Sequence, residues 1–151
     1  MRVRAFDLAV AATILIGSTA VAMADAAVAI HSTLGANGLV LDGAGSSSTR
    51  IVKVAELSVS TDDADGFALS ITSGSLTRAG GTPITFQVVL VERGAGAPSS
   101  GSFTTSSGDS FQVSTTSAGT VERDLYIKYR AAALQDPGAY TAAIHLDVVD
   151  N

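Results

Sequence analysis

The sequence contains neither cysteine nor tryptophan among its 151 residues. Without cysteine there can be no disulfide bond, no thiol nucleophile, and no thiolate ligand for zinc or an iron–sulfur cluster. The fold must therefore be held by packing and backbone hydrogen bonds. Without tryptophan, the chain also lacks the large aromatic platform that a sugar-cleaving cleft with paired carboxylates would need. These absences argue against several classes of enzyme.

Histidine is scarce as well, because only His31 and His145 are present. His145 alternates with apolar residues near the C-terminus, so we expect it to face solvent beside Asp147. Neither histidine has a nucleophile motif near it, and the sequence has no G-x-S-x-G elbow. The glycine-containing stretches 43–45 and 94–96 lack the lysine and the following helix of a phosphate-binding loop. We therefore expect no enzymatic activity and no cofactor.

Residues 1–24 have the composition of a secretory signal peptide. Arg2 and Arg4 form a positively charged start, an apolar stretch follows over residues 8–21, and Ala22-Met23-Ala24 supplies the small side chains of a cleavage site. The apolar stretch is shorter than the ~20 residues that a membrane-spanning helix needs, which argues against the alternative of an uncleaved anchor. We therefore predict cleavage after residue 24 and a secreted, periplasmic or cell-surface location.

Removing residues 1–24 from the 151 leaves 127 residues, which is the size of a single domain covering residues 25–151. The loss of Arg2, Arg4 and Asp7 changes the formal net charge from −5 to −6. An acidic surface with scattered cations would repel phosphate backbones and anionic lipids. We therefore expect no nucleic-acid partner and no membrane insertion after cleavage.

Apolar residues recur with a period of two between clusters of Gly, Ser, Thr and Asp, which is typical of short half-buried strands joined by turns. The clearest predicted strands cover residues 67–72, 84–90, 111–113, 125–129 and 140–148. No convincing helix is longer than residues 131–134, so the crossover helices of a parallel α/β fold are missing. The pattern predicts an all-β protein, an antiparallel immunoglobulin-like β-sandwich of seven or eight strands.

The first part of the mature domain is less regular. In residues 51–60 the apolar phase changes, and a β-bulge near Ala55-Glu56 would reconcile the two halves. The N-terminal segment 25–41 offers one or two further strands, over residues 26–34 and 39–41. A Gly/Ser-rich stretch at residues 42–50 separates this segment from the body, and we interpret it as a flexible loop.

Asp62, Asp63 and Asp65 crowd the turn before Gly66. Carboxylate oxygens on a glycine turn are candidate calcium ligands. The spacing does not match an EF-hand loop, and we favour a solvated turn in which Asp and Gly serve the backbone geometry. We predict no other metal site.

The C-terminal quarter carries one family resemblance. It contains Asp124-Leu125-Tyr126-Ile127-Lys128-Tyr129, then the stretch 131–140 ending in Asp136-Pro137-Gly138-Ala139-Tyr140, then an alternating strand to Val148. This ending of roughly thirty residues resembles that of spore coat protein U-like and chaperone-usher pilin-like domains of secreted bacterial proteins. Many spore coat U-type domains carry a disulfide, which this chain cannot form.

The resemblance implies an incomplete sandwich whose groove accepts a strand from a neighbouring subunit. The donor segment would be the apolar start of the mature chain, with Ala27, Val28, Ala29, Ile30 and Leu34 as its candidate residues. The partners would be other copies of the chain in a homo-polymer, and a periplasmic chaperone. The same segment could instead form the first strand of its own domain, because the sequence alone does not distinguish the two pairings.

Two functions from different classes follow. The first is a non-catalytic exported structural protein, a pilus (fimbrial) or surface-assembly subunit that polymerises by β-strand exchange. The alternative is a monomeric extracellular or periplasmic binding module for a glycan or a protein. The first requires self-association, whereas the second requires a folded monomer.

Overall fold

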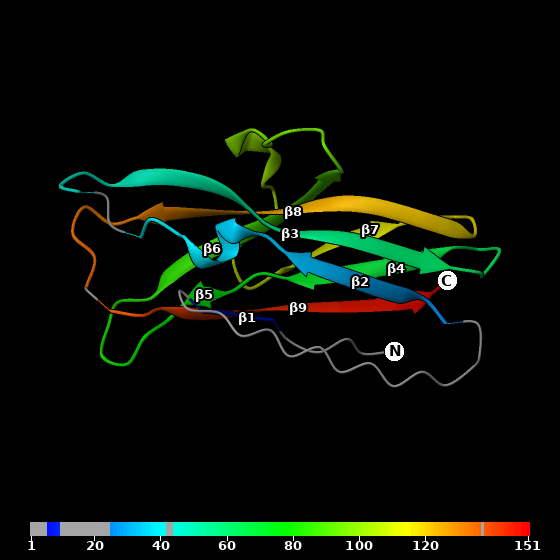
Figure 1. The fold of residues 1–151 in the computed structure, drawn as a ribbon, viewed down its shortest axis with the longest axis horizontal. Helices are drawn as coiled ribbons and strands as arrows, with labels where there is room; N and C mark the ends of the chain where they lie inside the picture. The colour runs from blue at the N-terminus through cyan, green and yellow to red at the C-terminus, as the bar shows by residue number, and fades with distance from the viewer. Residues whose placement is uncertain (1–5, 10–24, 42–43, 137) are drawn as a thin grey trace.

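The computed structural model describes residues 6–9, 25–41, 44–136 and 138–151, and it consists of two antiparallel β-sheets packed face to face (Figure 1). One sheet has the strand order β2 (Ala27–Ser32), β3 (Ser48–Thr61), β8 (Gly119–Ala131), β6 (Ile84–Glu92) and β5 (Ser75–Leu76). The other has the order β1 (Phe6–Ala9), β9 (Thr141–Asp150), β4 (Phe67–Thr72) and β7 (Ser110–Ser114). Two short 3-10 turns, η1 (Leu34–Asn37) and η2 (Ser100–Ser102), lie between strands.

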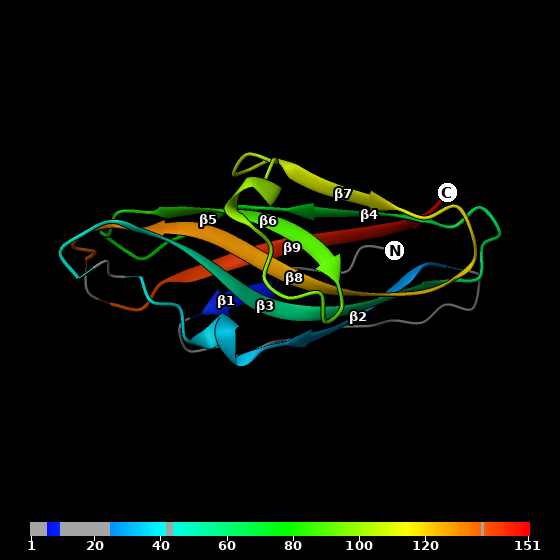
Figure 2. The ribbon, with the colours of Figure 1, turned by 90° about the horizontal axis from the view of Figure 1, so that it is seen from above.

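This architecture confirms the predicted all-β antiparallel sandwich. Eight of the described strands, β2 to β9, lie within residues 25–151. The strands of both sheets run along the long axis of the molecule (Figure 2). Among the residues that the structure describes, no helix is long and apolar enough to cross a membrane.

The core lies between the two sheets and is built from alternate residues of each strand, as the period of two predicts. In β4 the inward residues Phe67, Leu69 and Ile71 are each no more than 1% exposed. The inner faces of β8, β6 and β9 contribute further buried residues: Leu125, Ile127, Tyr129, Phe86, Val88, Ile144, Leu146 and Val148. Burial of this apolar area is the main favourable term in folding. No disulfide adds to it, because the chain has no cysteine.

The bulge predicted in residues 51–60 is present, one residue before its predicted position. The register of β3 against β8 shifts between Lys53 and Ala55. The extra residue allows Val54 to point into the core while Leu57 and Val59, in the opposite sequence phase, also remain buried. The bulge therefore lets one long strand bury both halves of its apolar sequence.

The structure differs from the sequence-based expectations in three segments. Residues 48–50 belong to β3 and not to a loop that extends through residue 50, because they pair with the far end of the long strand β8. Residues 39–41 do not form a strand, although Leu39 is buried in the core. Residues 131–134 contain no helix, since β8 continues as far as Ala131.

Part of the predicted signal peptide is a strand in this structure. Phe6–Ala9 form β1, which pairs antiparallel with residues 141–144 of β9. Residues 1–5 and 10–24, including the predicted cleavage site at Ala22-Met23-Ala24, lie outside the described part of the chain. The structure therefore places a segment of the predicted leader on the sheet of the mature domain.

The loop of residues 93–109, which carries η2, folds over the outer face of the five-stranded sheet (Figure 1). Phe103 is buried there against Val89 and Tyr126 in a small second cluster. The Nε2 amide of Gln87 donates hydrogen bonds to the backbone oxygens of Phe103 and Thr105, at 3.3 and 2.7 Å. We call this segment the η2 loop.

The two clusters predict different costs for two phenylalanine truncations. Phe86→Ala, in the main core, should lower the free energy of unfolding by about 3–5 kcal/mol. Phe103→Ala should cost about 1.5–3 kcal/mol, because it removes one buried side chain that holds a loop. Urea unfolding measures both values. Hydrogen exchange should speed up mainly in residues 97–109 of Phe103→Ala, and a uniform increase over both sheets would contradict the separate role of the second cluster.

Candidate functional site

Two edge strands come together at one end of the sandwich. Within residues 25–151, β2 is the edge strand of the five-stranded sheet and β9 is the edge strand of the other sheet. Asp150 joins them at one end: its Oδ2 accepts a hydrogen bond from the Ala26 N–H at 3.0 Å, and its Oδ1 accepts one from Thr61 Oγ1 at 2.5 Å. We call this side of the molecule the β2–β9 seam.

The outer edge of β9 is only partly paired. Thr141 exchanges both backbone hydrogen bonds with Thr77, and the Asn151 N–H donates to the Gly66 oxygen. The backbone N–H and C=O groups of these odd-numbered residues therefore point toward the β4 side of β9. Because backbone groups alternate along a strand, those of even-numbered residues 142–150 point toward the seam. The pairing with β1 reaches no further than Ile144. Beyond it, no strand of the described chain pairs with this edge.

The predicted donor segment lies at the same seam and is paired within its own chain. Ala27, Val28, Ala29 and Ile30 are in β2, antiparallel to residues 57–60 of β3. Ile30 is buried, whereas Ala27 and Ala29 are exposed. Leu34 lies in η1 with 91% of its surface exposed. As a result, four of the five candidate residues occupy an edge position in this single chain.

The acidic turn satisfies its own backbone. Asp63 Oδ1 accepts a hydrogen bond from the Asp65 N–H at 2.8 Å, and the Asp63 oxygen accepts one from the Gly66 N–H at 3.1 Å. Asp62 is exposed beside them. Over residues 6–9, 25–41, 44–136 and 138–151, no three His, Cys, Asp or Glu side chains form a group that could hold a metal ion. The geometry of this turn is explained by the backbone it stabilises.

The two histidines belong to different sheets. His31 lies in β2 opposite Glu56, and His145 lies in β9 opposite Thr72. Both are exposed. The fold therefore does not place them in a common buried site.

A buried ion cluster lies on the outer face of the five-stranded sheet, and no motif in the sequence indicates it. Asp124 is 2% exposed, and its Oδ1 lies 2.8 Å from Lys53 Nζ. Lys53 Nζ also contacts Glu56 Oε1 at 2.7 Å. The Gly94 N–H donates to Asp124 Oδ2 at 3.0 Å. Every partner of this carboxylate comes from a different strand or turn.

These contacts set the protonation of the cluster. Burial raises the pKa of the Asp124 carboxyl, but the hydrogen bonds from Lys53 and from the Gly94 N–H outweigh burial and hold the pKa below its ordinary value of 3.8. The hydrogen bond to Asp124 is the largest effect that raises the pKa of Lys53. The hydrogen bond from Lys53 also lowers the pKa of Glu56. The charged forms of Asp124, Lys53 and Glu56 are therefore favoured.

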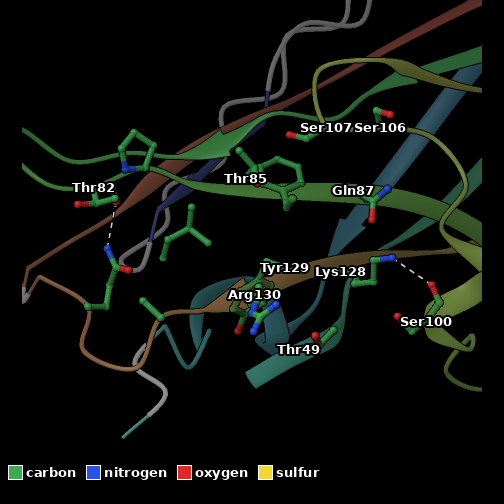
Figure 3. A pocket seen from close by; sticks show the side chains of 15 residues that line it. Thr49, Thr82, Thr85, Gln87, Ser100, Ser106, Ser107, Lys128, Tyr129 and Arg130 are labelled. Carbon is green, nitrogen blue, oxygen red and sulfur yellow. Dashed lines mark hydrogen bonds between the residues drawn. The ribbon is translucent and has the colours of Figure 1, made fainter. Parts of the chain in front are cut away.

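A polar cavity of about 550 Å³ opens on the outer face of the five-stranded sheet (Figure 3). Its lining comes from β3, β6, β8, the η2 loop and the turns at residues 82–83 and 132–135. The polar side chains among the lining residues are Thr49, Thr82, Thr85, Gln87, Ser100, Ser106, Ser107, Lys128, Tyr129, Arg130 and Gln135. One feature of the sequence indicates this cavity. Lys128 and Arg130 are two residues apart in β8, so their side chains lie on the same, outward face of the strand.

Comparisons of this chain with protein-family models, with curated proteins and with solved structures found no match.

The ion cluster predicts an acid limb in the stability profile. A carboxyl whose folded pKa is lowered adds stability above its unfolded pKa, and this stability is lost as the pH falls through the folded pKa. Asp124→Asn should therefore lower the free energy of unfolding at pH 7 by about 1–3 kcal/mol and flatten its decline below pH 4. Urea titrations between pH 2 and pH 7 measure this.

The matched control for this prediction is Asp109→Asn, which removes the same charge from an exposed side chain. It should leave both the stability at pH 7 and the acid limb close to those of the parent. An acid limb equally steep in Asp124→Asn and in the parent would show that other carboxyls control acid unfolding.

Proposed function

We propose that the protein is a non-catalytic exported structural subunit, of the pilus or surface-assembly kind, that assembles through β-strand exchange at the β2–β9 seam. The observation that carries the proposal is the pairing of β1 with β9, because a strand from outside residues 25–151 has been added to the edge of the sheet. An edge that takes one added strand offers the backbone groups to take another.

Removal of the leader after residue 24 would remove β1 and leave the outer edge of β9 unpaired along residues 141–150. The inward side chains Ile144, Leu146 and Val148 lie directly behind that edge and are no more than 2% exposed here. An added strand would pair with the unpaired N–H and C=O groups, and this favours association.

The donor in this proposal is the segment that forms β2, residues 27–32, with Leu34 beyond it. Among the strands that the structure describes, β2 pairs with β3 and with no other. Its main ties to the core are Ile30 and the preceding Ala26. In this proposal β2 leaves β3 of its own copy and enters the seam of the next copy, where it pairs with β3 as before and also with the β9 edge that β1 occupies here. The contacts with β3 are conserved, which is why strand exchange has a low net cost. Repeated head-to-tail exchange gives a polymer.

The alternative function, a monomeric extracellular binding module for a glycan or a protein, is favoured by the polar cavity on the outer sheet face. It differs from the first proposal in its assembly state.

Size-exclusion chromatography with light scattering on residues 25–151 tests the assembly. We expect oligomers whose size grows with protein concentration and which persist on mild heating. A folded monomer at every concentration would contradict strand exchange and favour the binding module. Deletion of residues 25–36 is a poor test by itself, because it removes Ala26, Ile30 and Ala36 from the core.

A cysteine pair distinguishes exchange from pairing within one chain, and the cysteine-free sequence makes the readout clean. Ala27 and Ser60 are partners across β2 and β3. In an antiparallel ladder, paired Cα atoms are about 4.5–5.5 Å apart, which suits a disulfide. Oxidised A27C/S60C should therefore run as a covalent ladder on a non-reducing gel if β2 is exchanged.

The control pair is S70C/Q112C, which joins β4 to β7 at partner positions far from the seam. Exchange of β2 leaves this pair within one chain, so oxidation should give only a monomer band. A monomer band from A27C/S60C as well would mean that β2 stays on its own β3, and would contradict the proposed donor.

A further inference from the structure

The cavity on the outer sheet face is separate from the assembly seam. None of its lining residues belongs to β2 or β9. Its floor is the polar face of β8 and β6, where Lys128 and Gln87 are cross-strand partners. A volume of about 550 Å³ lies within the range of small-ligand sites.

One wall of the cavity is held in place by the packing of the η2 loop. Phe103 is 5% exposed and packs on the sheet, and this fixes the loop that carries Ser100, Ser106 and Ser107. The Ser106 oxygen and the Gly74 oxygen accept hydrogen bonds from Ser73 Oγ and Ser107 Oγ, at 3.1 and 2.8 Å. The cavity is therefore organised before any ligand enters.

The charge of the cavity is opposite to that of the protein. The chain has a net charge of −5, yet the lining contains Lys128 and Arg130 and no Asp or Glu. Asp136, which is not among the lining residues, lies beside Thr82: its Oδ2 accepts a hydrogen bond from the Thr82 N–H at 2.9 Å. Within the described chain neither cation forms an ion pair, whereas Lys53 and Arg93 both do.

Hydrogen bonds hold both cationic side chains in place, and each side chain keeps further N–H donors for a ligand. Lys128 Nζ donates to the Ser100 oxygen at 3.0 Å (Figure 3). The same atom lies 5.1 Å from the centre of the Phe103 ring. An ammonium group has three donors, so two remain. Arg130 bonds to Ser47 Oγ through Nε and Nη2, which leaves Nη1 available. These donors suit an oxyanion.

The remaining lining favours a hydroxyl-rich ligand. Side-chain hydroxyls and amides, such as those of Thr85, Ser107 and Gln135, can both donate and accept hydrogen bonds with sugar hydroxyls. The aromatic lining residues Phe86 and Tyr129 are 1% and 2% exposed, so they offer no open ring on which a nucleobase could stack.

We propose that this cavity binds an acidic carbohydrate, with Lys128 and Arg130 holding a carboxylate or sulfate group and the surrounding hydroxyls and amides binding the sugar. The site gives the protein a binding activity in addition to assembly. It does not depend on strand exchange, since its residues lie away from the seam.

Fluorescence anisotropy of labelled tetrasaccharides tests the proposal with residues 25–151, and the readout works for monomer and polymer alike. The probes are a galacturonate tetramer, a sulfated heparin tetrasaccharide and neutral maltotetraose. We expect at least one acidic probe to bind about tenfold or more tightly than the neutral one. The tighter of the two acidic probes identifies the anionic group.

Four variants locate the binding. Lys128→Gln and Arg130→Gln should each weaken it by about tenfold. Arg50→Gln removes the same charge from a residue outside the lining and should have less than about a twofold effect. Lys128→Arg keeps the charge and should keep binding. If Lys128→Gln loses binding because the η2 loop has loosened, hydrogen exchange in the η2 loop of that variant will also be faster than in the parent.

Three results would overturn the proposal. They are absence of binding by both acidic probes, equal binding of maltotetraose, and an equal loss in Arg50→Gln and in the two cavity variants. The last result would mean that only net charge matters.

Discussion

The long antiparallel pairing of β3 with β8 is the interaction on which the rest of the structure depends. It runs from the Ser48–Ala131 pair to the Thr61–Gly119 pair, interrupted by one bulge. With no disulfide available, this ladder and the apolar face beneath it hold the centre of the molecule. β2 is added to the free side of β3, and β6 to the free side of β8. The donor segment and the cavity floor are therefore both extensions of one strand pair.

The two proposed activities use different parts of this sheet. Strand exchange uses its edge, where backbone hydrogen bonds provide affinity with little dependence on side chains. Carbohydrate binding uses its outer face, where Lys128 and Arg130 project between the η2 loop and the turns at the end of the sheet. A polymer joined at the seam would leave each copy of the cavity on its surface. In that arrangement many weak sites act together, and their avidity can exceed the affinity of one site.

Much of the fold could be predicted because it depends on local periodicity. Phe67, Leu69 and Ile71 reveal a strand by alternation alone, and the phase change in residues 51–60 indicates a bulge. The burial of Asp124 could not be predicted in this way, since its partners, Lys53 and the Gly94 N–H, come from elements distant in sequence. The cavity depends on Phe103 folding a Ser/Gly-rich loop onto the sheet. The pairing of β1 with β9 is a backbone contact at an edge, which leaves no pattern in the side chains.

The most direct test of the account is amide hydrogen exchange at the edge of β9, residue by residue, in three samples. These are the full chain of residues 1–151, residues 25–151 at low concentration, and residues 25–151 after assembly. The account predicts that the Ala142 and Ile144 amides, which point toward the seam, exchange slowly in the full chain. They should exchange fast in residues 25–151 at low concentration and slowly again after assembly. The Thr141 amide, which bonds to Thr77, should stay protected throughout. Equal protection of Ala142 and Ile144 in all three samples would contradict the claim that this edge accepts a strand.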